Sequence, residues 1–399
     1  MTNTAGWHDA IVNLSAHPVG WSLARLARRL PPVFSVPGFG VVVSDAEFAH
    51  QVLVRDDLFT KNGEGSLSSI MTELLGPLAL GNMDGEAHAC LRGRLADVVA
   101  PPQAPELLRA CDAPLEEVYA ALKRGETVDL VQSMRWMSGR ITFDMLGVTL
   151  QGRDQRAACI EIVALGERIA SGFDFRRPSA TRRSRVREDC ERLAGYARVG
   201  YESDDAPPRS FVRRLRDLGL TFEEARGVLS LIFLAGTLTT AAALPRILAL
   251  LIDSRQFDAL RTAPEAIPLA VSEGLRFTTP VPATMRIAQQ DTSVMDRRIK
   301  RGTRMVVLTC NLARDPSVFE TPDRFIANRR QPQRSRNLWF GAGAHFCLGF
   351  AIAQRQLQMV LQGLALLDGA LRIVRRSAAR GVIIPAYARL EIALDPTRA

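Results

Sequence analysis

The stretch FGAGAHFCLG, from Phe340 to Gly349, combines three glycines, one histidine and one cysteine. A phosphate-binding loop of dinucleotide enzymes needs the pattern GxGxxG, but Phe346 stands where the third glycine belongs. A zinc site needs three or four ligands at known spacing, whereas this stretch offers only His345 and Cys347. The spacing therefore argues against both a nucleotide loop and a zinc site.

A single axial thiolate is the remaining interpretation of this stretch. Glycines let the backbone curl around a flat cofactor, and an amphipathic helix is predicted to begin just after Cys347. The free backbone N–H groups at a helix start can face a sulfur anion and stabilise it. The residues therefore fit a haem whose iron is ligated by Cys347.

Composition sets the broad class of the protein. The chain has 399 residues, 47% of them hydrophobic, so it can bury a large core. Its net charge of +9 comes from scattered arginines, and with 6% aromatic residues it offers no stacking platform, so no nucleic-acid partner is expected. Its six cysteines form no CxxC pairs, which argues against a disulfide framework.

Hydropathy predicts a protein without a membrane span. We expect no window to approach the roughly 20 apolar residues of a span. The first twenty residues show neither a basic leader followed by an apolar run nor a cleavage signal. The expectation is a soluble, cytoplasmic protein with no membrane partner.

Residue patterns predict a mainly helical chain with small sheets. Residues 34–44 read as a hairpin around Pro37 and Gly38, followed by a helix capped by Asp45. Helical periodicity dominates from Gly85 to about Leu250, and residues 222–252 read as one long, buried central helix. After Pro280 come short extended runs such as RMVVLTCN (304–311), a Pro- and Arg-rich stretch over 315–337, and an amphipathic helix over 348–367.

The chain resembles the cytochrome P450 family, whose signature FxxGxxxCxG is matched by Phe340, Gly343, Cys347 and Gly349. SEGLR (272–276) is similar to the family's ExxR signature, and NLARDPSVFETPDRF (311–325) to a further family stretch. The resemblance runs from about residue 34 to 370. It implies one domain over 1–399, with 1–33 as a lead-in and 34–399 as a triangular prism whose long central helix lies over the haem.

The resemblance also implies which residues hold the cofactor, haem b. The family pairs its ExxR residues, here Glu273 and Arg276, with an arginine that is either Arg329 or Arg324. Phe340 would shield the thiolate of Cys347, and Gly341 and Gly349 would shape its loop. The matching donors to the haem propionates are His88, Arg92, Arg286 and His345.

The central helix departs from the family at one position. The family pattern (A/G)Gx(D/E)TT is matched by Ala235, Gly236, Thr239 and Thr240, but Leu238 stands in place of the acid. The small pair would make room for dioxygen, and Thr239 would donate a hydrogen bond to it. Either water and neighbouring hydroxyls supply the protons for hydroxylation, or the missing acid marks radical coupling, ring closure or peroxide-driven chemistry.

Substrate contacts in the family come from segments matching 66–80, 165–175, 231–239 and 281–284. Most of these residues are apolar or small, so a hydrophobic substrate, such as one of secondary metabolism, is expected. The basic stretch FDFRRPSATRRSRVR (173–187), with Arg176 and Arg177, leaves an anionic or carrier-bound substrate open. The candidate pocket residues are Leu231, Leu234, Leu238, Val281, Ala283 and Thr284.

The resemblance further implies a monomeric monooxygenase that uses dioxygen. Its electrons would come from NAD(P)H through a ferredoxin reductase and an acidic ferredoxin, which Arg92 and Arg94 could help to attract. A haem protein that binds a ligand without turnover remains a second class.

Overall fold

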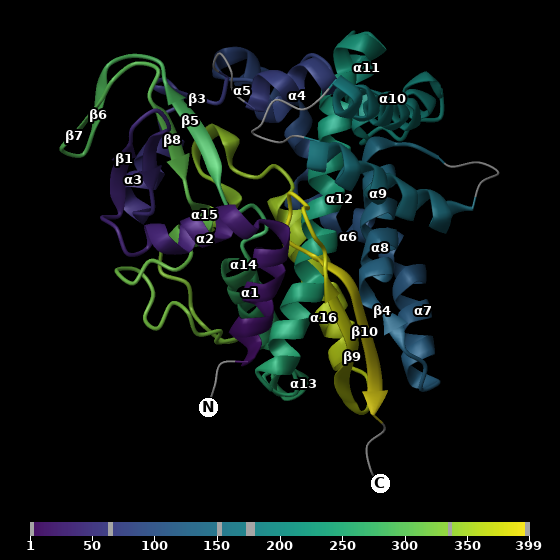
Figure 1. The fold of residues 1–399 in the computed structure, drawn as a ribbon. Coiled ribbons are helices and arrows are strands. Elements are labelled where there is room, and N and C mark those ends of the chain that lie inside the picture. The colour runs from purple at the N-terminus through teal and green to yellow at the C-terminus, as the bar shows by residue number, and fades with distance from the viewer. Residues whose placement is uncertain (1–3, 63–66, 150–153, 173–179, 334–336, 396–399) are drawn as a thin grey trace. The chain divides into compact units, whose positions relative to one another are not determined.

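The computed structural model describes residues 4–62, 67–149, 154–172, 180–333 and 337–395. Its chain forms two compact units, which are described separately. The first comprises Met1–Phe59, Ala113–Met134 and Thr239–Ala399, and the second comprises Thr60–Asp112 and Arg135–Leu238. The predicted class, mainly helical with small sheets, is confirmed (Figure 1).

The first unit is built around a five-stranded sheet with the order β1-β2-β8-β5-β3. The predicted hairpin is confirmed: β1 (Val33–Val36) and β2 (Gly40–Val43) are antiparallel. Gly38, in the turn, has a φ of 73°, a left-handed value that glycine adopts without strain. β2 runs parallel to β8 (Arg304–Val307), which pairs antiparallel with β5 (Thr284–Ala288), and β3 (Phe59–Thr60) forms the edge.

Helix α3 (Ala46–Val54) follows this hairpin as predicted, and the side chain of Asp45 accepts a hydrogen bond of 2.7 Å from the backbone N–H of Phe48. This cap satisfies one of the free donors at the helix start. The apolar side of α3, including Phe48 and Val52, packs with Val43 of β2 in one buried cluster. The helix is thereby fixed to the sheet.

Two smaller sheets complete the strands of the described residues. β4 (Val128–Asp129), β10 (Tyr387–Asp395) and β9 (Ala370–Ala378) form one, and β6 (Thr292–Val294) and β7 (Arg297–Ile299) form the other. No sequence pattern predicted β9 and β10. The predicted extended run RMVVLTCN is longer than the strand, because the strand ends at Val307 and the helix α15 (Thr309–Leu312) follows.

The other helices of the first unit surround these sheets. Packing is close at Gly363 of α16, where an added Cβ would lie 1.6 Å from the hydroxyl oxygen of Tyr119, so a side chain there would displace the tyrosine ring. These helices are α1 (Thr4–Ala16), α2 (Pro18–Ala27), α7 (Asp112–Lys123), α13 (Ala259–Thr262), α14 (Ile267–Thr278) and α16 (Phe350–Ala365).

The second unit is helical in its described residues, as the periodicity after Gly85 predicts. Gly139 lets α8 approach α9 closely, since a Cβ there would lie 2.6 Å from the carbonyl oxygen of Cys159. The helices are α4 (Leu67–Leu75), α5 (Gly85–Leu95), α6 (Ala104–Leu108), α8 (Leu130–Leu146), α9 (Gln155–Gly172), α10 (Ala180–Glu202) and α11 (Phe211–Asp217).

The predicted central helix is α12 (Phe222–Asp253), which has 32 residues and contains Pro245. The expectation that no window approaches a membrane span is wrong by composition, because α12 is long and apolar enough to cross a bilayer. However, 72% of its apolar window is buried inside the protein, as in the core helix of a soluble protein. Length and composition here therefore reflect a core position.

Candidate functional site

The cysteine loop, Phe340–Gly349, begins at the end of one short 3-10 turn, contains a second one and leads into α16. The backbone N–H of Cys347 donates a hydrogen bond of 2.9 Å to the carbonyl oxygen of Phe340, which closes the loop on itself. Gly341 and Gly343 have φ values of 80° and 63°. A Cβ at Gly343 would also lie 2.8 Å from the carbonyl oxygen of Leu53 in α3. Position 343 therefore requires glycine for two reasons, its positive φ and this close approach.

Three phenylalanine rings stiffen this loop. The ring centroids of Phe340 and Phe350 lie 4.9 Å apart in an edge-to-face arrangement, and those of Phe346 and Phe350 lie 5.2 Å apart. Such contacts fix ring positions and add to the stability that apolar burial provides. The loop that carries Cys347 is therefore held by its own hydrogen bond, by α3 and by an aromatic cluster.

Cys347 differs from the buried cysteines of the chain in its surroundings. Burial raises the pKa of Cys111, Cys159 and Cys190 to about 12, and that of Cys310 to about 11. Those thiols stay protonated and cannot readily serve as anionic ligands. Cys347 is half-buried and Cys90 is exposed. Of these two, only Cys347 lies in a loop that leads into a long helix.

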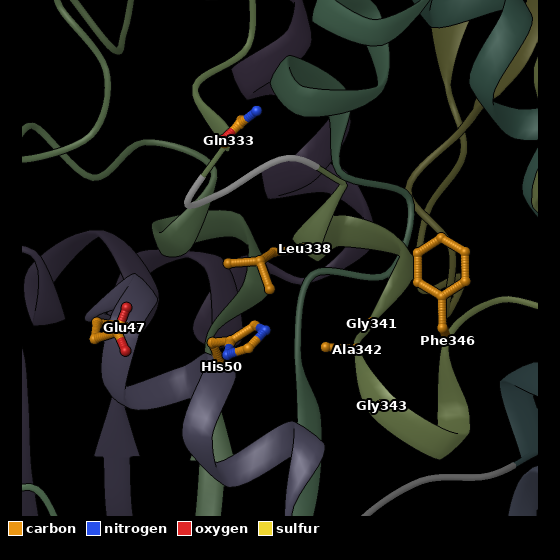
Figure 2. A pocket seen from close by; sticks show the side chains of 8 residues that line it. All are labelled: Glu47, His50, Gln333, Leu338, Gly341, Ala342, Gly343 and Phe346. Atoms are coloured by element: carbon orange, nitrogen blue, oxygen red, sulfur yellow. The ribbon is translucent and has the colours of Figure 1, made fainter.

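A hollow of about 420 Å³ opens beside the cysteine loop. Figure 2 shows its wall on the loop side, from Leu338 to Phe346, and Glu47 and His50 of α3 on the other side. Both α3 side chains are exposed, so solvent reaches the outer side of the loop here.

A buried carboxylate connects α14 to the segment that precedes the cysteine loop. Both oxygens of Glu273 accept hydrogen bonds from Arg276, at 2.7 and 2.8 Å. Nε of Arg329 donates to Glu273 at 3.1 Å, so the arginine that the sequence left open is Arg329. Arg324 contributes only its carbonyl oxygen, which accepts from Arg276 and Arg329.

Two further donors to this carboxylate carried no sequence signal. The backbone N–H of Ile326 donates to Glu273 at 3.0 Å, and the side-chain amide of Gln331 donates at 3.3 Å. The side chains of Glu273 and Arg276 are both 0% exposed. A desolvated charge needs this many partners, since a buried carboxylate without them is strongly unfavourable.

The predicted propionate donors fall in both units. In the first unit, Arg286 is buried on β5 and donates to Thr284 Oγ1 at 3.3 Å and to the carbonyl oxygen of Met285 at 2.9 Å, and His345 is half-buried in the cysteine loop. In the second unit, α5 carries His88, which is buried, and Arg92, which is half-buried. Buried cationic groups of this kind suit a ligand that carries carboxylates.

Residues 235–240 of α12 include small side chains that are less buried than their neighbours. Ala235 is exposed and Thr239, four residues later, is half-buried, whereas Thr240 is buried. Residues four apart lie on the same face of a helix. A flat group can therefore approach the backbone of α12 along this face.

Two of the predicted pocket residues on α12 pack against α9. A Cβ at Gly166 of α9 would lie 3.2 Å from Leu234 and 3.3 Å from Leu238, and both leucines are buried. Leu231 is half-buried and approaches Gly81 in the same way. On the first unit, Val281 and Ala283 are exposed and Thr284 is half-buried. Ser66, residues 173–175, Arg176 and Arg177 lie outside the described residues.

Each unit, taken by itself, carries residues of kinds that suit haem. The first unit offers a thiol in a rigid loop and a buried arginine, and the second offers the buried His88 and the exposed face around Ala235. A thiolate ligand, cationic partners for two carboxylates and flat access are what haem requires of a protein.

Replacing Glu273 with Gln should unfold the first unit more easily. The change leaves Arg276 and Arg329 buried without their counter-ion, which costs about 3–5 kcal/mol of unfolding free energy. Chemical denaturation followed by circular dichroism measures this loss. Glu126→Gln, which removes an exposed pair with Arg124, is the matched control and should leave the midpoint unchanged. Equal midpoints for both variants would contradict the structural role of Glu273.

Thiol labelling should separate Cys347 from the buried cysteines. At mildly alkaline pH the raised pKa values keep Cys111, Cys159, Cys190 and Cys310 protonated, so iodoacetamide should leave them unmodified until the chain unfolds. Cys90 should react at once, and Cys347 should react without haem but be protected with haem. Peptide mass spectrometry measures each site. Equal reaction of Cys347 in both forms would exclude it as the ligand.

Known proteins resemble this chain over parts of its length. Residues 267–364 match the family model Cytochrome P450. "Putative cytochrome P450 140" of Mycobacterium tuberculosis is 39% identical over 140 residues, which are 35% of this chain and 32% of that protein. "Putative cytochrome P450 YjiB" of Bacillus subtilis is 26% identical over 329 residues, covering 78% and 80% of the two chains.

The fold is shared more widely than the sequence. A solved structure described as "P450BioI in complex with hexadec-9Z-enoic acid ligated Acyl Carrier Protein" aligns with a TM-score of 0.78 at 20% identity, over 96% of this chain and 99% of that one. The matches to the first curated relatives span only about a third to a half of their lengths. Family model and related bacterial chains nevertheless agree, the fold is the one seen in solved cytochrome P450 structures, and the chain is similar to the cytochrome P450 family.

Proposed function

We propose that the chain is a haem-thiolate monooxygenase that uses dioxygen and external electrons to hydroxylate a hydrophobic small molecule. The observation that carries this proposal is the half-buried Cys347 in a glycine-shaped, aromatic loop at the start of α16. When bound, haem supplies the activation of dioxygen. Its thiolate ligand is the feature that favours cleavage of the oxygen–oxygen bond.

The chain's own residues would hold the cofactor and manage protons. Cys347 would ligate the iron, and Arg286, His345, His88 and Arg92 would bind the propionates. Thr237 donates its hydroxyl proton to the carbonyl oxygen of Phe233 at 2.6 Å, so its proton is committed to the helix backbone. Thr239 and Thr240 are the hydroxyl groups that the family pattern places here to donate toward dioxygen, beside the small residues Ala235 and Gly236.

The substrate we infer is hydrophobic. Apolar or small surfaces for contact are offered by Val281, Ala283, Thr284 and Leu231. The side chains of Leu234 and Leu238 pack between α12 and α9. Apolar linings with few polar groups are typical of sites for hydrophobic small molecules.

The electron donor we infer is a ferredoxin that receives electrons from NAD(P)H through a reductase. Ferredoxins are acidic, and the chain has a net charge of +9. Arg94 is exposed on α5 and is available for long-range attraction, which raises association rates more than affinity.

An anionic or carrier-bound substrate is a second candidate. It is supported by Arg183 and Arg185, which are exposed near the start of α10. The acyl-carrier-protein complex named for one structural neighbour is consistent with it. Arg183→Glu together with Arg185→Glu should then weaken binding of a fatty acid but leave binding of the matching alcohol unchanged, as measured by the spectral shift of the haem.

Carbon monoxide binding and turnover test the main proposal together. The reduced holoprotein should give the thiolate spectrum under carbon monoxide, and a surrogate ferredoxin with its reductase should yield hydroxylated product from a panel of terpenes, steroids and fatty acids. Cys347→Ser should lose both signals, while Cys90→Ser, which removes an exposed cysteine on α5, should keep both. A thiolate spectrum without product from any member of the panel would favour a ligand-binding protein instead.

Leu238→Glu tests whether the missing acid alters the reaction. If water already supplies protons for hydroxylation, a carboxylate should raise product formed per electron by about two- to tenfold without changing the product. Leu238→Gln is the matched control, because it has a similar shape but does not ionise. Melting of both variants checks that the contact with Gly166 survives. A different product from Leu238→Glu would support an unusual reaction in the wild type.

A further inference from the structure

The first two helices carry an unusual concentration of exposed apolar side chains. Of the thirteen large hydrophobic residues that are exposed among the described residues, seven lie between Trp7 and Leu30. Scattered exposed apolar residues need no explanation, but a concentration of them in one short segment does. This segment therefore requires a physical account that the proposed monooxygenase function does not give.

The exposed residues form one stripe on each helix. Trp7, Ile11 and Leu14 follow the spacing i, i+4, i+7 on α1, and Val19, Leu23 and Leu26 repeat that spacing on α2. We call these six residues the N-terminal apolar face. Trp7 is 68% and Val19 is 70% exposed. The two helices follow each other with only His17 between them, and α2 turns away from the direction of α1 (Figure 1).

The opposite sides of both helices are anchored in the first unit. Val12 and Ala16 of α1 and Ala24 of α2 are buried. Asp9 is buried as well and forms an ion pair of 2.7 Å with Arg246 of α12. The N-terminal apolar face therefore belongs to helices that are already docked on one side and cannot simply turn inward.

The charges around the face are positive. Residues 4–44 contain one acid, Asp9, and three arginines, Arg25, Arg28 and Arg29. Arg25 and Arg29 are exposed, whereas Arg28 forms a bidentate pair with Asp323 at 2.9 and 2.8 Å.

The carboxylates that contact this segment are neutralised by arginine. Asp9 pairs with Arg246, and Asp323 pairs with Arg28. Asp253, which contacts His8 at 3.0 Å, also pairs with Arg376. The face is therefore apolar with a positive edge, which complements an anionic surface.

We propose that the N-terminal apolar face binds the surface of an anionic lipid membrane. Helices of 13 and 10 residues are too short to cross a bilayer, so they would lie in the interface with their apolar stripes among the lipid tails. Trp7 suits the headgroup level, where tryptophan is enriched, and Arg25 and Arg29 attract anionic headgroups. A two-fold contact of the face with itself would instead bring like charges together.

Vesicle co-sedimentation of the full-length holoprotein tests this proposal. The wild type should bind vesicles of equimolar phosphatidylcholine and phosphatidylglycerol, and bind vesicles of phosphatidylcholine alone more weakly. Leu23→Gln with Leu26→Gln should lower binding to the mixed vesicles about tenfold or more, because apolar burial drives insertion. Arg25→Gln with Arg29→Gln should lower it by roughly fivefold per arginine, on the anionic vesicles only.

The matched control is Leu366→Gln, which alters an exposed leucine at 83% exposure outside the face and should leave binding unchanged. All substituted side chains are exposed, so an unchanged melting curve and haem spectrum should accompany each variant. The proposal is overturned if the wild type binds neither vesicle, or if Leu23→Gln with Leu26→Gln binds as well as the wild type. It is also overturned if the wild type dimerises without binding vesicles and that double variant is a monomer.

Discussion

The carboxylate of Glu273 is the group on which the first unit depends most. It lies at 0% exposure and receives hydrogen bonds from Arg276 of its own helix and from Arg329, Ile326 and Gln331 of the following segment. A charge removed from water is tolerated only when its partners are fixed, so the ion pair in turn fixes the segment. The guanidinium of Arg276 also lies 4.9 Å from the ring centroid of Phe319, and its Nη1 donates to the carbonyl oxygen of Ala313. One helix thus holds a long stretch without regular structure, and that stretch leads into the cysteine loop.

The cysteine loop adds a second constraint, which is backbone shape. Gly343 combines a left-handed φ with an approach to Leu53 that no side chain could share, so α3 and the loop fit together only through glycine. The three phenylalanines then fill the space that the turn leaves. Rigidity of this kind matters for a ligand atom, because a metal bond is sensitive to small displacements of its donor. The raised pKa values of the buried cysteines make those thiols poor anionic ligands, since they leave them in the protonated form.

Patterns among neighbouring residues predicted much of this structure, but they did not predict contacts between residues far apart in the sequence. The cap at Asp45, the hairpin before it and the extent of α12 follow from neighbours in the sequence, and all appear in the structure. The sequence could not decide whether Arg324 or Arg329 pairs with Glu273. Both arginines lie in irregular chain, where no helical or strand periodicity predicts which way a side chain points. The donors Ile326 and Gln331 lacked a signal for the same reason. The run predicted for β8 was too long because Leu308 and Cys310 continue its apolar pattern, and only the turn into α15 ends the pairing.

Leu238 packs against α9 at a position where the family pattern has an acid. The family pattern places an acid here, yet in this chain the side chain is buried and meets the glycine at 166, which has room for it. A carboxylate in the same place would be desolvated, which raises its pKa and favours its protonated form. Such a group would suit proton donation, and this chain has an apolar side chain in its place. Leu238 and Gly166 together therefore allow α9 and α12 to pack tightly at this point. The chain has an apolar contact there in place of a titratable group.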